Sequence, residues 1–234
     1  TGATGAVNIA AVTDSADANL TVSASTNATI AAVTLDNGGA GVVSISADDD
    51  DNTAGATLQV GGVISATGAV TLAGGTDNDD AIDVNSSVTS GGALVVQNTN
   101  GADLAAGVAL TGASVTATNA VTAVNLSGPG ANLVTGTAGD IALADVTDSA
   151  NATMIVRATG GVTLATVTLD DGGSGSLSVT ADTDNTGLST LLAAGAITVD
   201  GSASFAGGTD NDELLDFDAD VVAGGAVGIT NGNV

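Results

Sequence analysis

The chain contains the same long sequence twice. Three segments recur: Val-Thr-Asp-Ser-Ala (12–16 and 146–150), Val-Thr-Leu-Asp (33–36 and 167–170) and Gly-Gly-Thr-Asp-Asn-Asp (74–79 and 207–212). The offset is 134 for the first two segments and 133 for the third, because the second copy lacks one residue of the acidic run near Asp50. Self-similarity on this scale is typical of repeat architectures. We therefore divide the chain into a repeat unit over 1–134 and a second, incomplete unit over 135–234.

Short segments in both units alternate apolar and polar residues, as half-buried strands do. Gly, Asn and Asp residues stand between them and favour turns. Strand openings recur about 23 residues apart, for example at Val7 and Ile30, which is within the range of one solenoid coil. The sequence predicts an all-β chain folded as a parallel β-helix, a β-solenoid with about six coils per unit. An array of β-sandwiches is the alternative, although such modules usually contain a core Trp or Tyr.

The composition fits a narrow core. Apolar residues make up 44% of the chain, yet there are only two Phe, one Met and no Trp or Tyr. Aromatic side chains bury the most area in ordinary globular cores. A stack of coils filled by Ala, Val, Leu and Ile does not need them, so we expect Phe205 and Phe217 to be core residues.

The net charge of −25 restricts the partners. The chain has 26 acids and one base, Arg157, which we expect to point outward from a strand. Phosphate binding requires Lys and Arg, so a nucleic-acid partner is not expected. No apolar run is long enough for a membrane helix, and two Phe cannot form the aromatic girdles of a membrane barrel. We therefore expect no membrane insertion.

Several Gly-rich strand phrases, such as those at 68–75, 160–164 and 195–199, resemble repeats of filamentous-haemagglutinin-like and other giant bacterial surface proteins of the adhesin type. The resemblance implies a right-handed parallel β-helix in a long extracellular fibre used for adhesion or cell contact. It extends over nearly the whole chain but is mostly compositional, and the secretion domain of that family is not visible here.

Acidic clusters are the candidate sites. The predicted calcium ligands are the acids of the Gly-Gly-Thr-Asp segments and the strands after them: Asp77, Asp79, Asp80, Asp83, Asp210, Asp212, Glu213 and Asp216. Calcium takes six to eight oxygen ligands in forgiving geometry. Residues 74–82 and 207–215 also resemble calcium-binding nonapeptide repeats, but Asp77 and Asp210 replace the glycine at their fourth position. The alternative is that all these acids, with the run 48–51, are solvated turn residues.

The functional expectations follow from the repeats. The chain has no His, Tyr or Lys for acid–base chemistry and no aromatic platform for sugars, so we do not expect an enzyme. We predict a structural repeat protein that forms a stiff rod, fibre or sheath at a bacterial cell surface, stabilised by calcium. An adhesin region that binds a surface glycan or protein is the alternative. Because open strand edges invite pairing, we expect its partners to be adjoining repeats or copies of itself, end to end.

Overall fold

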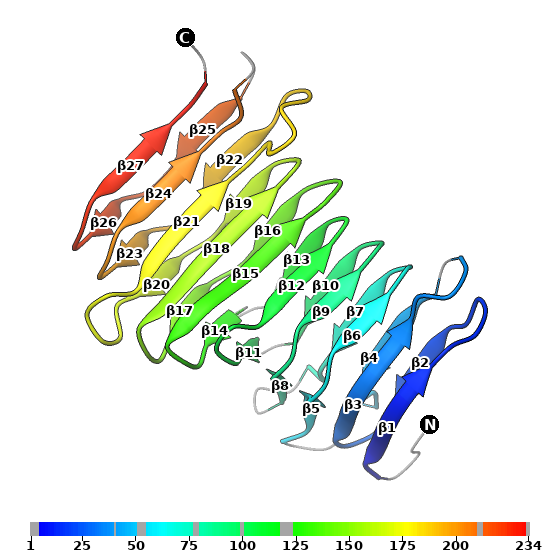
Figure 1. Cartoon of the computed structure of the whole chain (residues 1–234). Coiled ribbons are helices and arrows are strands. Elements are labelled where there is room, and N and C mark those ends of the chain that lie inside the picture. The colour runs from blue at the N-terminus through cyan, green and yellow to red at the C-terminus, as the bar shows by residue number, and fades with distance from the viewer. Residues whose placement is uncertain are drawn as a thin grey trace.

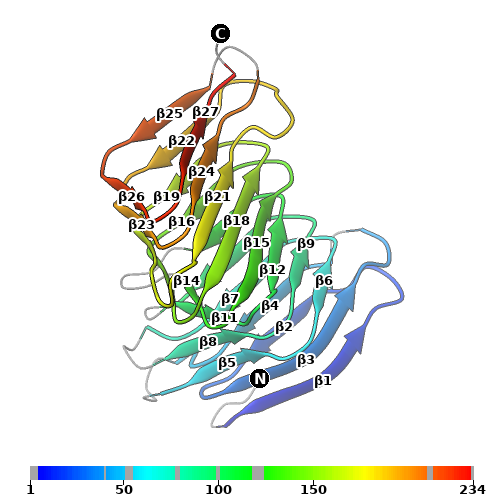
Figure 2. The same ribbon diagram turned by 60° about the vertical axis from the view of Figure 1, so that its left-hand side comes forward.

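The computed structural model describes residues 5–39, 41–50, 55–76, 80–98, 101–117, 124–209 and 213–232, and these ranges contain strands and turns but no helix. Every strand pairing is parallel, and the strands stack as a β-solenoid of about nine coils (Figure 1). Figure 2 shows the coils stacked along one axis, with the N-terminal and C-terminal coils at opposite ends. The predicted all-β parallel solenoid is confirmed, and discrete two-layer sandwiches are excluded.

Each coil crosses three faces. Face 1 contains β1 (Val7–Thr13), β3 (Ala28–Leu35), β5 (Thr57–Val60), β8 (Ala81–Val84), β11 (Ala102–Leu104), β14 (Val124–Leu126), β17 (Val146–Asp148), β20 (Val167–Leu169), β23 (Ile197–Val199) and β26 (Val221–Ala223). Face 2 contains the second halves of β1 and β3, then β6 (Ile64–Ala66), β9 (Val88–Ser90), β12 (Ala109–Gly112), β15 (Gly130–Gly136), β18 (Ala152–Ala158), β21 (Ser176–Thr180), β24 (Ala203–Ala206) and β27 (Val227–Thr230).

Face 3 is a separate nine-stranded sheet. It contains β2 (Leu20–Ser23), β4 (Val43–Ser46), β7 (Val70–Ala73), β10 (Leu94–Gln97), β13 (Val115–Ala117), β16 (Ile141–Leu143), β19 (Val162–Leu164), β22 (Thr190–Ala193) and β25 (Leu214–Phe217). The turns that join the faces form three edges of the stack, which we call corner 1–2, corner 2–3 and corner 3–1 after the faces they connect.

The interior is built from ladders of small aliphatic side chains. In a typical strand of three residues, the outer two are buried and the middle one points outward, as in β20. Parallel register places each inward residue on its counterpart one coil away, for example Val33 beside Ile64. Phe205 is fully buried and its ring meets that of Phe217 edge-on, with centroids 5.0 Å apart. The structure thus gives both Phe residues the expected packing role, and Arg157 is exposed on β18.

The two sequence copies occupy different faces of the stack. Ala28 is paired on face 1, whereas its equivalent Val162 lies on face 3. Val33 lies on face 2, whereas its equivalent Val167 lies on face 1. From Ala28 to the residue before Val162, the chain crosses one face of the stack seventeen times. The strand β3 accounts for two of these crossings, because its two halves lie on faces 1 and 2, and the strands β4 to β18 account for the other fifteen. Six full coils would need eighteen crossings, so one sequence repeat fills five and two-thirds coils. Each residue of the second repeat therefore lies one face earlier than its equivalent in the first repeat.

The local structure is the same in both copies despite this rotation by one face. Away from the two ends of the stack, equivalent inward residues are buried in both copies, as Val33 and Val167 are, because all three faces enclose the same aliphatic interior. The backbone N–H of Asp48 donates to Thr26 O at 3.1 Å, and that of its equivalent Asp182 donates to Gly160 O at 3.1 Å. The expected figure of about six coils per unit is therefore too large by one strand. The boundary between units, at residues 134 and 135, falls inside β15, within a continuous stack.

Candidate functional site: the acidic corners

Many acids at the corners join one coil to the next. A side-chain oxygen in one coil accepts the backbone N–H of a turn residue in the coil above: Asp14 accepts Asn37 N at 3.3 Å, Asp140 accepts Gly161 N at 2.7 Å, and Asn151 accepts Ser174 N at 2.9 Å. At a corner the chain leaves the sheet, so these N–H groups lose their strand partners and must find others. The acidic turns therefore extend the hydrogen-bond ladder around the corners.

One group of polar side chains is buried inside corner 3–1. Asp48 follows β4, Asp80 precedes β8 and Asn98 follows β10, so the three come from successive coils, and all are buried. Asp80 Oδ1 accepts Ala56 N at 2.9 Å, and Asn98 Nδ2 donates to Asp80 O at 3.0 Å. We call Asp48, Asp80 and Asn98 the first acidic corner.

Two glycines make room for this group. A side chain at Gly75 would collide with Asp80 Oδ2 and would lie 2.9 Å from Asp48 Oδ2. A side chain at Gly74 would lie 2.7 Å from Asn98 Oδ1. The paired glycines of the repeated segment are thus required by close approach to buried polar groups. The Asp48 and Asp80 carboxylates approach the same point above Gly75, and burial next to a like charge is electrostatically costly.

The second copy repeats the arrangement at corner 2–3. Asp182 and Glu213 are buried there, and Asn231 Nδ2 donates to Glu213 O at 3.2 Å, as Asn98 donates to Asp80 O. A side chain at Gly208 would collide with Asp182 Oδ2. Asp48 and Asp182 both have left-handed backbones, with φ of 45° and 50°. We call Asp182, Glu213 and Asn231 the second acidic corner.

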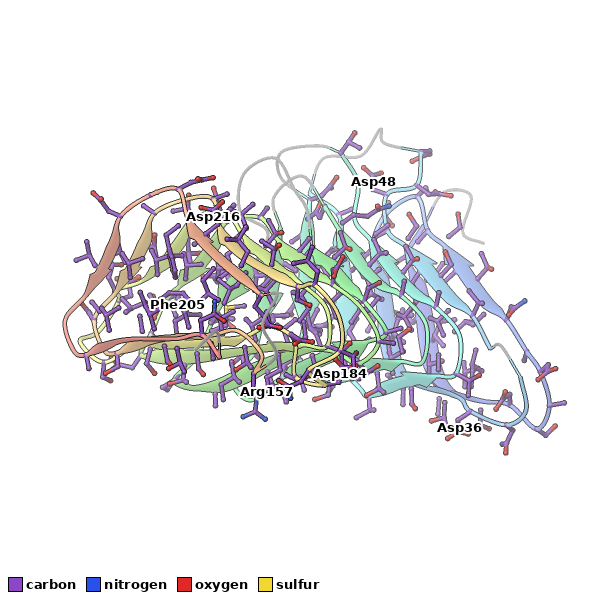
Figure 3. The ribbon with its side chains drawn as sticks, turned by 90° about the horizontal axis from the view of Figure 1, so that it is seen from above. Asp36, Asp48, Arg157, Asp184, Phe205 and Asp216 are labelled. Atoms are coloured by element: carbon purple, nitrogen blue, oxygen red, sulfur yellow. The ribbon has the colours of Figure 1, made fainter. Side chains whose placement is uncertain are left out.

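The figures show the change of corner between the two copies. In Figure 3, Asp48 lies on one side of the stack, whereas Asp184, which follows Asp182 closely in sequence, lies on the other side with Asp36. Asp36 belongs to a turn at corner 2–3 of the first copy. Corner 2–3 therefore holds different turns of the repeat in its two halves.

The structure separates the predicted calcium ligands. Asp80 and Glu213 are buried in the acidic corners. Asp83 and Asp216 point outward from the strands β8 and β25, where Asp83 Oδ2 accepts Asn85 Nδ2 at 2.9 Å and Gln59 Nε2 at 3.3 Å. The other four predicted ligands lie outside the described residues: Asp77, Asp79, Asp210 and Asp212. Within the described ranges, no three acidic side chains form a group that could hold a metal ion.

Sequence reasoning missed the partners from neighbouring coils. The run 48–51 and its echo at Asp182 and Asp184 are visible as acidic, but nothing in the sequence joins them to the Gly-Gly-Thr-Asp segments. The available signal is spacing: Asp80 follows Asp48 by 32 residues and Glu213 follows Asp182 by 31, slightly more than one coil. Only the lengths of the intervening turns decide that these residues meet.

A further buried acid lies at corner 1–2. Asp148 is the last residue of β17 and is buried, and its carboxylate accepts Asp171 N at 3.2 Å and Ala152 N at 3.3 Å. Burial raises the pKa of Asp148 above its ordinary value; the two backbone N–H donors lower the pKa, and the nearby Asp171 and Asp170 charges raise it. Desolvation is the largest of these effects, so this acid destabilises the fold when ionised.

A shallow hollow of about 340 Å³ lies beside corner 2–3. It is lined by residues of three successive coils, among them Asp140, Gly161 and the strongly exposed Leu188. Its walls contain no cation and no aromatic ring, so it offers shape but little binding chemistry. Among the described residues there is no helix with the length and hydropathy of a membrane span.

Comparison with protein-family models, with curated proteins and with solved structures found no match for this chain. What the structure establishes is the class: a parallel β-solenoid with duplicated acidic corners.

Proposed function

We propose that this protein is a structural repeat protein, a stiff segment of an extracellular rod, fibre or sheath at a bacterial cell surface. The observation that supports the proposal is the uninterrupted stack, in which each coil hydrogen-bonds to the next along three faces and again at the corners. Such a stack has no hinge between repeat units, because the unit boundary lies within β15. The proposal includes no catalytic role.

The first test is the shape and the location of the protein. With strands about 4.8 Å apart, nine coils form a rod about 40 Å long, which small-angle X-ray scattering can measure. Immunogold labelling of intact cells that make the protein should place gold on their surface or on filaments. Gold confined to the cell interior would refute the proposed location and fibre role.

Adhesion is the second candidate function. It is favoured by the turns at the corners that expose apolar side chains, such as Leu188 at corner 2–3 and Val63 at corner 1–2. A partner would be a surface glycan or protein. Beads coated with the protein should then stick to target cells, and Leu188→Ser should weaken this adhesion. Equal retention of coated and albumin-coated beads would count against adhesion.

Calcium stabilisation stays a prediction. What supports it is the approach of two buried carboxylates, Asp48 and Asp80, to one point above Gly75, since a divalent cation relieves repulsion between like charges. Millimolar calcium should raise Tm more than magnesium or NaCl of equal ionic strength, and Asp80→Asn should reduce the difference. Identical Tm values in all three salts would refute specific binding.

A further inference from the structure

One exposed turn of the first copy contains an asparagine followed by a glycine, Asn37-Gly38. The turn lies at corner 2–3, between β3 and β4. The φ of Gly38 is 121°, a backbone conformation that glycine adopts readily. The side chain of an Asn can react with the backbone nitrogen of the next residue, and a glycine at that position has no side chain to obstruct the approach. The sequence and the exposure of this turn therefore favour that reaction.

Hydrogen bonds hold the backbone on both sides of the Gly38 nitrogen. Asn37 N donates to Asp14 Oδ1 at 3.3 Å, and Gly39 N donates to Asp17 Oδ1. Among the residues that the structure describes, none accepts the N–H of Gly38. This nitrogen therefore needs to break no hydrogen bond before it reacts, while its two neighbours are fixed in place.

The second copy contains the same turn with an acid in place of the amide. Residues 35–39 and 169–173 differ only at their third position, which is Asn37 in the first copy and Asp171 in the second. Asp171 N donates to Asp148 Oδ1 at 3.2 Å, as Asn37 N donates to the equivalent acid, and φ of the following glycine is 124°. The turn thus accepts either side chain, so conversion of Asn37 to an acid is compatible with its backbone.

Other Asn-Gly and Asp-Gly pairs have a bonded glycine nitrogen. In the second copy, Gly172 N donates to Asp170 O at 3.2 Å. The chain has two further Asn-Gly pairs, at Asn100 and Asn231. Asn100 lies outside the described residues, whereas Asn231 is half-buried and its following nitrogen donates to Gly208 O at 3.0 Å. Of these pairs in the described part of the chain, Asn37-Gly38 alone combines an exposed amide with an unbonded glycine N–H.

We propose that Asn37 is a site of spontaneous deamidation in the folded protein, with the unbonded nitrogen of Gly38 as the nucleophile. This nitrogen attacks Cγ of Asn37 and closes a five-membered succinimide ring, while Nδ2 leaves as ammonia and takes the proton of the Gly38 N–H. Water then opens the ring at either carbonyl and produces Asp or isoaspartate, in which the main chain runs through the former side chain. Water is the only other reactant. Because ring closure is intramolecular, the geometry of the turn sets its rate.

The reaction removes a contact between the first two coils. Asn37 Nδ2 donates to Asp14 O at 2.9 Å. A carboxylate has no N–H, so both products lose this hydrogen bond. They also add a negative charge to a turn that already contains Asp14, Asp17 and Asp36. We expect Tm of the converted protein to fall by about 2–4 °C, the shift typical of losing one such interaction in a chain of this size.

The test measures conversion site by site. Wild type is incubated at mildly alkaline pH, folded in one series and in urea in the other, and is then digested with a protease that cleaves before Asp. The digest releases residues 36–47, which contain Asn37 as their only Asn. Mass spectrometry of this peptide gives the fraction of amide converted to acid, and fragmentation by electron transfer separates Asp from isoaspartate.

Asp171→Asn is the matched control. It gives both copies the same five-residue turn sequence, so that the glycine nitrogen, bonded in the second copy and unbonded in the first, is the difference under test. The same protease releases the substituted turn as residues 170–181. Asn37→Gln is the unreactive control, because its side chain would have to close a six-membered ring, which is a much slower reaction.

In the folded protein, Asn37 should convert at a rate within about tenfold of its rate in urea, since only its own side-chain contact must be released. Position 171 of the Asp171→Asn variant should convert about fivefold more slowly than Asn37, which is the value of one backbone hydrogen bond. In urea the two positions should react equally. The fall of Tm on incubation should be absent in Asn37→Gln.

Two results would overturn the inference. One is an intact Asn37 in the folded protein after the same residue has converted in urea. The other is conversion at position 171 of the Asp171→Asn variant as fast as at Asn37, which would show that the free N–H of Gly38 does not decide the rate. The inference concerns the chemistry of one turn and stands or falls independently of the cell-surface role, which the immunogold experiment judges.

Discussion

Several acids at the corners act as hydrogen-bond acceptors. At each corner, backbone N–H groups leave the sheet, and Asp, Asn or Ser oxygens from a neighbouring coil accept them. Lys and Arg have no acceptor atom, so they cannot replace these residues. Bonds to an ionised acceptor are also stronger than neutral ones. The acids at these corner positions therefore have a structural role that a base could not fill.

At Gly75, we predict that replacement by Ala destabilises the fold by about 2 kcal/mol, because overpacking typically costs 1–3 kcal/mol. The new Cβ would collide with Asp80 Oδ2 and crowd Asp48. The control is Gly61→Ala, since a Cβ at Gly61 meets only Ile30 O at an ordinary 3.6 Å. Urea unfolding of the two variants provides the comparison, and equal midpoints would contradict the packing argument.

At Asp148, we predict a dependence of stability on pH. The pKa of this acid is raised in the folded state, so the folded chain holds the proton more tightly than the unfolded chain. Its contribution to stability is complete below the ordinary pKa of Asp and is lost as the pH rises through the raised folded-state pKa.

The free energy of unfolding of wild type relative to Asp148→Asn should therefore rise as the pH is lowered from 7 to about 4. Asp36→Asn, at an exposed turn, controls for the loss of one negative charge. Urea titrations at several pH values measure the difference. A difference that is constant, or that falls with acid, would contradict the assignment.

At the scale of the strand, the elements are too short to be stable alone. Most have three or four residues, of which two point inward, so each strand depends on the coils above and below it. Stability then comes from continuous ladders of Val, Ile and Leu. The second copy departs from this uniformity where Phe205 and Phe217 replace Leu72 and Val84 and meet edge-on.

We predict that Phe205→Ala costs about 3–5 kcal/mol, because it removes a fully buried ring and leaves a cavity. Phe205→Leu restores the residue of the first copy and should cost much less, about 1 kcal/mol. Thermal and urea unfolding of both variants distinguish the two. If Phe205→Leu destabilises the fold as much as Phe205→Ala, the pair of rings is specific to this coil, and the core residues of the two copies cannot be exchanged.

At the scale of the whole molecule, the sequence repeat and the coil have different periods. The repeat ends one strand short of six coils, so equivalent turns move from corner 3–1 to corner 2–3. A rod built in this way presents the same turns on different edges along its length. Whatever contacts these turns make are therefore distributed around the rod.

This rotation can be tested by cross-linking, because the chain has no cysteine of its own. Asn125 and Thr147 are register partners, with Thr147 Oγ1 donating to Asn125 Oδ1 at 3.2 Å. We predict that Asn125→Cys with Thr147→Cys forms a disulfide under mild oxidation, as intact mass spectrometry would show. If one sequence repeat filled six full coils, residue 142 and not residue 147 would be the register partner of Asn125. Disulfide formation by Asn125→Cys with Ala142→Cys would therefore contradict the rotation.

Much of the fold could be predicted from the sequence, because alternation within strands and recurrence along the chain are local signals. They give the parallel solenoid, the aliphatic interior and the place of Phe205. The candidate site was predicted only in part: Asp80 and Glu213 are buried at corners, but Asp83 and Asp216 point outward. Asp48 and Asp182 escaped attention as partners, because their neighbours lie one coil away.

The sequence by itself determined that this chain is a stack of short strands, since inward and outward residues follow a period of two whichever face they occupy. Only the tertiary structure decided which corner each turn occupies and which acids meet there. The physical reason is that a three-sided coil with similar aliphatic walls accepts the same strand on any face. The face on which each strand of the repeat lies is therefore fixed by the summed lengths of all the turns before it. No single segment of the sequence contains that information.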